Sequence, residues 1–254
     1  MEFTYKGYKA LVKLAISCGY QLCNYFDYVE KEYPFILRHD IDMSLNKALD
    51  LARVENEIGV KSTFFVLLSS GFYNALNSKS IAIMHTIHNL GHTIGLHFDE
   101  KNYISDVGNP EASKLHIKQE AEILSDLVGT QINVYSYHRP SKEVLDANLD
   151  IPGLVNCYGD LFFKKFKYLS DSRRRWREPV FDIVESKKFP RIQLLTHAFW
   201  YNEVSISMGD ALKSFVYSAA DERYYCLGDN FSDLDDELRR ETCDEGMIKI
   251  QVLE

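Results

Sequence analysis

The stretch that decides the fold is FILRHDID, residues 35–42. It begins with a short apolar run typical of a buried strand and ends with two carboxylates, Asp40 and Asp42. On an extended chain residues two apart point to the same side, because side-chain direction alternates with a period of two. Paired carboxylates repel each other unless a cation or a proton-transfer role offsets the repulsion. The pair therefore indicates a metal site, a general base, or both.

The composition is that of an ordinary globular protein. The chain has 254 residues, of which 46% are hydrophobic and 26% charged, a size that suits one large domain or two small ones. The formal net charge of −8 argues against non-specific nucleic-acid binding through an overall basic field.

The cysteines and the N-terminus bear on the compartment. The cysteines are odd in number, scattered and without a CxxC pair, which indicates reduced thiols: Cys18, Cys23, Cys157, Cys226 and Cys243. Lysines interrupt the apolar part of the N-terminus, and we find no apolar run of about 18 residues, so neither a signal peptide nor a membrane span is expected. We expect a cytoplasmic protein.

Helical and extended segments alternate along the chain. Apolar spacing predicts helices over residues 5–18, 44–58, 80–90, 111–128, 208–217 and 233–242, and strands over residues 35–38, 62–68, 93–98, 132–137 and 191–196. Strands separated by helices of ten or more residues indicate an α/β fold with a parallel sheet. Without repeats or linkers, a single domain over residues 1–254 is the simplest interpretation.

Polar clusters follow the ends of these strands, where parallel α/β folds place their chemistry. There are five such clusters, at residues 39–42, 91–99, 136–141, 168–172 and 194–197. Taken in this order they resemble the polysaccharide deacetylase family, the NodB-homology or carbohydrate esterase 4 domain, over roughly residues 35–200. The resemblance is closest to a branch associated with bacterial surface-polysaccharide (O-antigen) biosynthesis.

The resemblance implies a distorted (β/α) barrel of about seven strands and metal-dependent hydrolysis of an N-acyl or O-acyl group on a sugar. It assigns Asp40 as general base and Asp42 as metal ligand. His97 matches the first metal histidine of the family, and a neutral imidazole is an ordinary zinc ligand. We therefore expect one divalent metal ion, with zinc the first choice.

The chain departs from the family pattern at the second metal histidine, whose position is held by Lys101. A lysine cation cannot ligate, so either the metal is lost or another side chain replaces the histidine. Asp99 lies on the same strand face as His97, and His138 precedes the arginine of the next motif. We favour His138.

Three other histidines are interpreted as structural or solvent-facing. His92 lies five residues before His97, and an odd separation puts the two on opposite faces of a strand. His85 and His88 have helical spacing and are expected on a solvent face.

The remaining motifs supply the other groups that hydrolysis of an acyl group would use. The resemblance makes Arg139 the arginine that positions the carboxylate of Asp40, and a guanidinium there would hold that group ionised. Asp171 would pair with the arginine or orient the distal histidine. His197 would protonate the leaving amine after Asp40 has taken a proton from water.

A basic stretch bears on the substrate. Residues 164–177 hold seven basic side chains against one aspartate. Arg175 and Trp176 in this stretch are candidates for gripping the phosphate of a nucleotide- or lipid-linked sugar, the alternative being a solvated face. Trp200 is a candidate for stacking on a sugar, the alternative being core packing.

The leading hypothesis is a metal-dependent deacetylase or deformylase acting on a small amino-sugar precursor, with no nucleic-acid partner. The first alternative is a metal-free, catalytically inactive barrel that acts as a carbohydrate-binding or scaffold protein, as Lys101 suggests. A second alternative is a different metal hydrolase on a similar barrel, one that cleaves cyclic amides.

Overall fold

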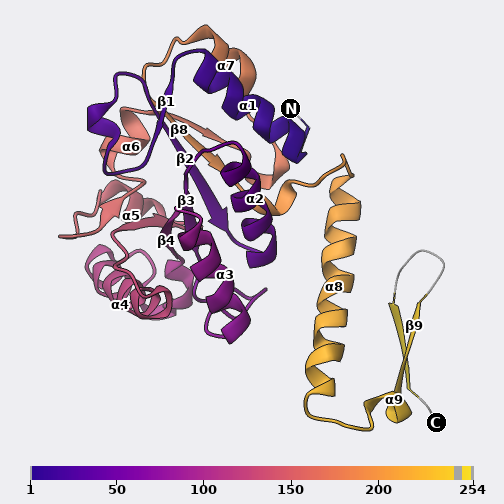
Figure 1. The fold of residues 1–254 in the computed structure, drawn as a ribbon. Coiled ribbons are helices and arrows are strands. Elements are labelled where there is room, and N and C mark those ends of the chain that lie inside the picture. The colour runs from indigo at the N-terminus through magenta and orange to yellow at the C-terminus, as the bar shows by residue number, and fades with distance from the viewer. Residues whose placement is uncertain (1, 243–247, 253–254) are drawn as a thin grey trace. The chain divides into compact units, whose positions relative to one another are not determined.

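A computed structural model describes residues 2–242 and 248–252. Contacts within the chain divide it into two compact units, Met1–Val204 and Ser205–Glu254. The parallel sheet lies entirely within the first unit (Figure 1). The second unit lies outside residues 35–200, the region of the family resemblance.

The first unit is built on one curled, wholly parallel sheet. Its strands run in the order β6-β5-β4-β3-β2-β8-β7, and β1 pairs with the start of β2. This architecture confirms the predicted α/β fold, a distorted barrel with seven strands along its path. The strands are β1 (Gln21–Cys23), β2 (Pro34–Ile41), β3 (Thr63–Val66), β4 (Thr93–Phe98), β5 (Val134–Tyr137), β6 (Val155–Asn156), β7 (Lys167–Ser170) and β8 (Ile192–Thr196).

Helices connect these strands, as βαβ units require. They are α1 (Tyr5–Ser17), α2 (Leu45–Glu57), α3 (Ser78–Asn89), α4 (Pro110–Val128), α5 (Lys142–Asp146), α6 (Asp160–Lys164) and α7 (Val180–Ser186). The predicted start of α2 is confirmed, because the Ser44 hydroxyl accepts a hydrogen bond from the Lys47 amide as an N-cap does. This cap begins the helix only two residues after Asp42, so the carboxylate sits in the short turn between β2 and α2.

The inner face of β2 carries an unusual charged residue within an apolar core. Ile36 packs with Phe65 and Val134 in this core, while Arg38 and Asp40, on the same face by alternation, are also buried. The Phe65 ring lies where a Cβ on Gly95 would be, only 2.6 Å from it, so the lack of a side chain there lets the ring reach its place under Arg38. Residue 95 must therefore be a glycine for this packing.

The outer face of β2 faces α1 and α2 through a second buried polar network. Glu55 of α2 accepts hydrogen bonds from the hydroxyls of Tyr8 and Ser62 and lies 3.0 Å from His39 Nε2. His92 completes the network, with Nε2 3.1 Å from the Ala52 carbonyl. His92 is thus a structural residue away from His97, as strand parity predicts.

The second unit contains α8 (Met208–Gly228), α9 (Leu234–Glu237) and an antiparallel pair, β9 (Leu238–Thr242) with β10 (Ile248–Val252). The helix predicted over residues 233–242 is therefore wrong beyond Glu237. The helical turn ends where pairing with β10 begins, and strand pairing overrides the weak local preference for helix.

The described cysteines are free thiols, in agreement with the prediction, and Cys243 lies outside the described residues. No helix in the described part of the chain has the length and apolar character needed to cross a membrane.

Glu120 of α4 is a buried carboxyl group with an unusual proton affinity. One of its oxygens accepts a hydrogen bond from the Tyr103 hydroxyl at 2.8 Å, and the other is buried without a partner among the described residues. Burial, together with the charge of Asp99, raises the pKa of Glu120 to about 7, although Tyr103 and His116 act in the opposite direction. The folded protein therefore binds this proton more tightly than the unfolded chain does.

This raised pKa predicts a pH-dependent stability. Glu120 favours folding below its unfolded pKa of about 4.3, and that contribution is lost as the pH rises toward 7. The unfolding free energy of the wild type should therefore fall between pH 5 and pH 8. In Glu120→Gln, which keeps an acceptor for Tyr103, this fall should be smaller than in the wild type by about 1–3 kcal/mol. Urea unfolding at the two pH values measures this. Glu122→Gln, an exposed residue of the same helix, should behave as wild type; equal pH slopes for both variants would contradict the assignment.

Candidate metal and acid–base site

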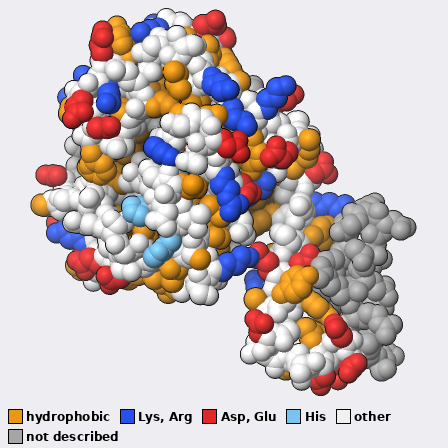
Figure 2. All heavy atoms as spheres, in the orientation of Figure 1, with side chains coloured by type: hydrophobic (Ala, Val, Ile, Leu, Met, Phe, Trp, Pro, Cys, Tyr) orange, Lys and Arg blue, Asp and Glu red, His pale blue; other side chains and the backbone are white. Residues whose placement is uncertain are grey.

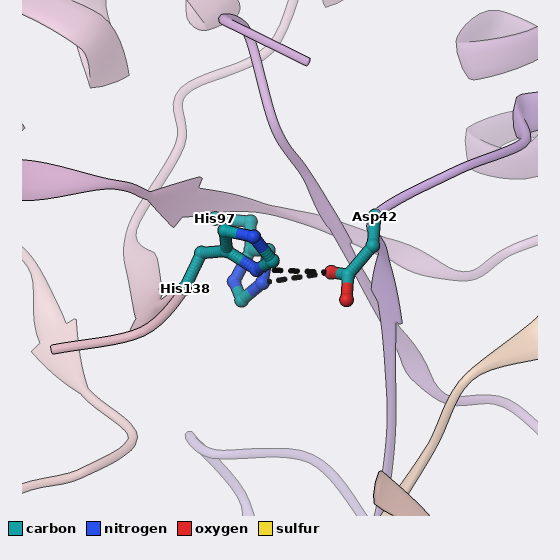
Figure 3. Close-up of side chains that lie close together, drawn as sticks. All are labelled: Asp42, His97 and His138. Atoms are coloured by element: carbon teal, nitrogen blue, oxygen red, sulfur yellow. Dashed lines mark ion pairs between the residues drawn. The ribbon is translucent and has the colours of Figure 1, made fainter. Parts of the chain in front are cut away.

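Three predicted ligands meet at the carboxyl ends of β2, β4 and β5. Asp42 follows β2, His97 lies on β4, and His138 follows β5. One ligand atom from each lies within 4.8 Å of the other two. Figure 3 shows the two imidazole rings approaching the Asp42 carboxylate together. The predicted trio is therefore a real spatial cluster.

The donors of this cluster suit a divalent cation. Asp42 Oδ1 lies 3.1 Å from His97 Nε2 and 3.3 Å from His138 Nδ1, yet it is buried and has no well-formed hydrogen bond among the described residues. Burial raises the pKa of Asp42, but the two histidines lower it by more. The resulting pKa is well below its usual range. Two imidazoles and one carboxylate form a donor set used by catalytic zinc sites, which leave further positions open.

A second layer of contacts orients His97. Its Nδ1 lies 2.7 Å from the Ser136 hydroxyl, which leaves Nε2 directed at Asp42. Such an outer hydrogen bond fixes the ring of a ligating histidine. His97 is buried, whereas His138 is partly exposed, so the cluster opens to solvent on the His138 side.

The structure distinguishes between Asp99 and His138, the two candidates for the third ligand. Asp99 is buried away from the cluster, where it pairs with Arg139 and accepts a hydrogen bond from the Lys101 amide. Lys101 is exposed in the short helical turn after β4. His138, and not Asp99, lies in ligand position beside Asp42 and His97.

Asp40 is held by an arginine other than the one we predicted. Arg38 donates from Nη2 to Asp40 Oδ2 at 2.8 Å and from Nε to Oδ1 at 3.2 Å, and both side chains are buried. Burial raises the pKa of Asp40, but Arg38, His97 and His197 together lower it by more, so the net shift is downward. Arg139 is exposed and pairs with Asp99 instead, so the expected contact of Arg139 with Asp40 is not present. Residue 38 takes that place because it lies on the same strand face as Asp40.

His197 and Asp171 form a second dyad beside the cluster. His197 Nδ1 lies 2.6 Å from Asp171 Oδ1, and Tyr201 donates a hydrogen bond to the same carboxylate. Burial lowers the pKa of His197, but Asp171, Asp42 and Asp40 together raise it by more, to about 9. His197 Nε2 then points at Asp42 from 3.7 Å. Asp171 thus contacts His197, which is the geometry that one of its two expected roles requires.

The predicted substrate-binding residues are not all at the site. Trp200 is buried against Phe199, with ring centroids 4.8 Å apart, as core packing requires. Arg175 is exposed. Trp176 lines a cavity that is described below. In the same basic stretch Lys164 and Lys167 are engaged in ion pairs with Asp160 and Glu178, so part of it is a paired surface.

Sequence reasoning missed Arg38 and Ser136. A signal for Arg38 was available, since a charged residue inside an apolar strand and two positions before Asp40 must share its face. Ser136 had no comparable signal, because its role depends on the register between β4 and β5, which pairs it with His97.

The visible surface of the protein carries side chains of both charges. Figure 2 shows histidine side chains reaching the surface among mostly uncharged groups, with acidic and basic side chains interspersed over the rest of the visible face. That pattern fits a small, largely neutral ligand better than a nucleic acid.

Comparisons with known proteins return structural likenesses alone. No family model matches the chain, and no curated protein matches it. A family 4 carbohydrate esterase from Bacillus anthracis has 17% identity and a TM-score of 0.43, over 84% of this chain and 85% of its own. The catalytic domain of a peptidoglycan N-acetylglucosamine deacetylase from Eubacterium rectale has 14% identity and a TM-score of 0.43, over 74% and 84%. A carbohydrate esterase family 4 pseudoenzyme from Bacillus anthracis has 11% identity and a TM-score of 0.42, over 75% of this chain.

The chain spans 62% of the length of that pseudoenzyme. These likenesses include both enzymes and a pseudoenzyme. At TM-scores below 0.5 they carry no weight for the chemistry, which rests on the geometry of the site itself.

The cluster predicts which side chains bind a metal. Wild-type protein should take up about one zinc ion per chain, and His138→Ala should lose most of this affinity because one of three ligands is gone. Asp99→Asn should bind zinc as wild type, because Asp99 is directed at Arg139. Titration calorimetry with zinc measures both. Loss of binding in Asp99→Asn with retention in His138→Ala would reverse the ligand assignment.

Proposed function

We propose that this protein is a metal-dependent hydrolase that removes an acyl group, acetyl or formyl, from an amino sugar. The observation that carries the proposal is the convergence of a three-ligand cluster with two flanking groups suited to proton transfer. Asp40 Oδ2 lies 3.8 Å from His97 Nε2, and His197 Nε2 lies 3.7 Å from Asp42 Oδ2. An acid and a base on either side of one ligand set is the arrangement that amide hydrolysis by water needs.

Asp42, His97 and His138 would hold the ion, with zinc as the first choice. A divalent ion bound there supplies a Lewis acid that polarises an acyl carbonyl and makes water more acidic. The nucleophile is water, so no serine or cysteine nucleophile is required.

The protein groups divide the proton transfers between them. Asp40, kept ionised by Arg38, accepts a proton from the attacking water. His197, oriented by Asp171, donates a proton through Nε2 to the departing nitrogen. The hydrogen bond from Tyr201 to Asp171 leaves the carboxylate no freedom to turn away from His197. The burial of Asp40 limits competing contacts with bulk water.

The substrate class follows from the motif order and from the surface. A small amino sugar, free or carried by a nucleotide or a lipid diphosphate as in surface-polysaccharide synthesis, is the class that the resemblance suggests. The mixed charge of the visible face supports a small ligand.

Replacement of Asp40 tests the base. In Asp40→Asn the acetate released from N-acetylated sugars and sugar nucleotides should fall at least about 100-fold, because the general base is lost. Zinc content should remain, because Asp40 is outside the ligand trio. Acetate assays and metal analysis on the same preparation measure the two effects. Asp126→Asn, an exposed aspartate of α4, controls for the change of carboxylate to amide.

Two results would contradict the proposal. Unchanged turnover in Asp40→Asn would exclude that residue as base. Wild-type protein that binds no zinc and releases no acetate or formate would instead support the alternative, an inactive barrel that binds carbohydrate or acts as a scaffold.

A further inference from the structure

The parallel sheet leaves a seam between its two end strands. Among the described residues no strand pairing joins β6 to β7, although the two are consecutive along the chain. Aromatic side chains take the place of backbone pairing at this seam. The Phe163 ring lies 5.2 Å from that of Tyr158 and 5.0 Å from that of Tyr168. These rings do not fill the seam, and a cavity of about 360 Å³ remains beside them.

The walls of this seam cavity are of two kinds. Tyr158, Phe163, Tyr168 and Trp176 supply aromatic surface. Hydroxyls and charges line the rest, from Ser170, Ser172, Arg177 and Glu178. A pocket with both an apolar face and several directional polar groups suits a ring that is itself amphipathic.

Ser170 and Ser172 supply hydroxyls to this cavity, and Trp176 supplies aromatic surface. Its indole Nε1 is buried and has no hydrogen-bond partner among the described residues. Because this atom has almost no accessible surface, Trp176 contributes the surface of its ring to the cavity and not its N–H. The Ser170 and Ser172 hydroxyls share one hydrogen bond at 3.0 Å, so one of the two O–H groups is left to donate to a ligand.

The cavity is next to the groups that act in the proposed reaction. The ring of Tyr158 lies 4.9 Å from the guanidinium of Arg38, which holds Asp40. Ser170 and Ser172 flank Asp171, which holds His197. A ligand in the seam cavity would therefore lie beside the site while leaving the ligand trio free.

We propose that the seam cavity binds a neutral pyranose ring of the substrate, an assignment that rests on the proposed function. Its volume is at the lower end of the roughly 300–1,000 Å³ typical of small-molecule pockets, too large for an acetyl group alone and suited to one ring. The C–H face of the sugar packs on the aromatic walls, and its hydroxyls meet the serines.

Charge supports a neutral ring over a phosphate. Arg177 and Glu178 contribute opposite charges to the lining, and Glu178 is also paired with Lys167 at 2.7 Å. The other arginines of the basic stretch, Arg173 to Arg175, do not line the cavity. The seam therefore selects for the sugar and not for a diphosphate carrier.

Tryptophan fluorescence tests the proposal without relying on turnover. The chain has two tryptophans, so Trp200→Phe leaves Trp176 as sole reporter. Methyl N-acetylglucosaminide should change its emission saturably, and inorganic phosphate should not. Phe163→Ala in this background removes one aromatic wall of the cavity, and Phe163 is partly exposed. This variant should weaken the apparent affinity for the glycoside about 3- to 10-fold. Phe26→Ala, of similar exposure but lining a different pocket, should leave it unchanged.

The outcomes separate this proposal from the proposed function. Ser170→Leu, which fills the cavity from β7, should abolish the signal and serves as a second variant if Phe163→Ala does not fold. Emission that is insensitive to the glycoside, or equally sensitive in Ser170→Leu, would overturn the sugar subsite even if acetate is released. A saturable signal that persists in His97→Ala, from a protein whose wild type releases no acetate, would keep the subsite and reject the hydrolase.

Discussion

The first unit is organised around one buried ion pair, that between Arg38 and Asp40. Both side chains are almost fully removed from water, at 0% and 4% exposure, so each charge would be costly without the other. The guanidinium is also sandwiched between the rings of Phe65 and Tyr158, at 5.0 and 4.9 Å. Removing Arg38 alone would leave a buried carboxylate uncompensated, a change that typically costs about 3–5 kcal/mol. The pair therefore ties the packing of the inner core to the charge state of the proposed base.

The two faces of β2 carry separate polar networks, and this separation has a mechanical consequence. On the inner face, Arg38 and Asp40 connect the strand to β3 and to the seam. On the outer face, His39 connects it to α2 through Glu55, and to β8 through the Thr196 hydroxyl at 2.6 Å. Thr196 immediately precedes His197. The strand ends that carry Asp40 and His197 are therefore linked to each other on the side away from the reaction. Such a link limits their relative motion, which matters because acid and base must keep a fixed separation.

Much of this arrangement was accessible from sequence, for a simple geometric reason. Alternation along a strand placed Asp40 and Asp42 together and put His92 away from His97, and parallel strands brought separate polar clusters to one edge. What could not be predicted depends on register and on neighbours. The family resemblance pointed to Arg139 as the partner of Asp40, yet the chain turns at Arg139 with a φ of 61° and leads its side chain to Asp99. The short strands β1, β6 and β7 carry too few residues for a periodic signal, and β9 exists only through its pairing with β10.

Lys101 stands where the family resemblance leads us to expect a histidine, and the candidate ligands are supported in another way. In this chain the trio comes from three separate strand ends, after β2, on β4 and after β5, and the turn that follows β4 contributes none of them. That turn is occupied by other contacts, since Asp99 caps it and Glu100 accepts hydrogen bonds from Gly108 and Ser141. Ligands fixed by neighbouring strands inherit the rigidity of the sheet, where a ligand in a loop would depend on loop order. The same adjacency puts Ser136, the neighbour of His97 in the β4–β5 register, in position to orient the ring. A three-donor cluster therefore forms without a histidine at position 101, because residues at the strand ends supply its members and their support.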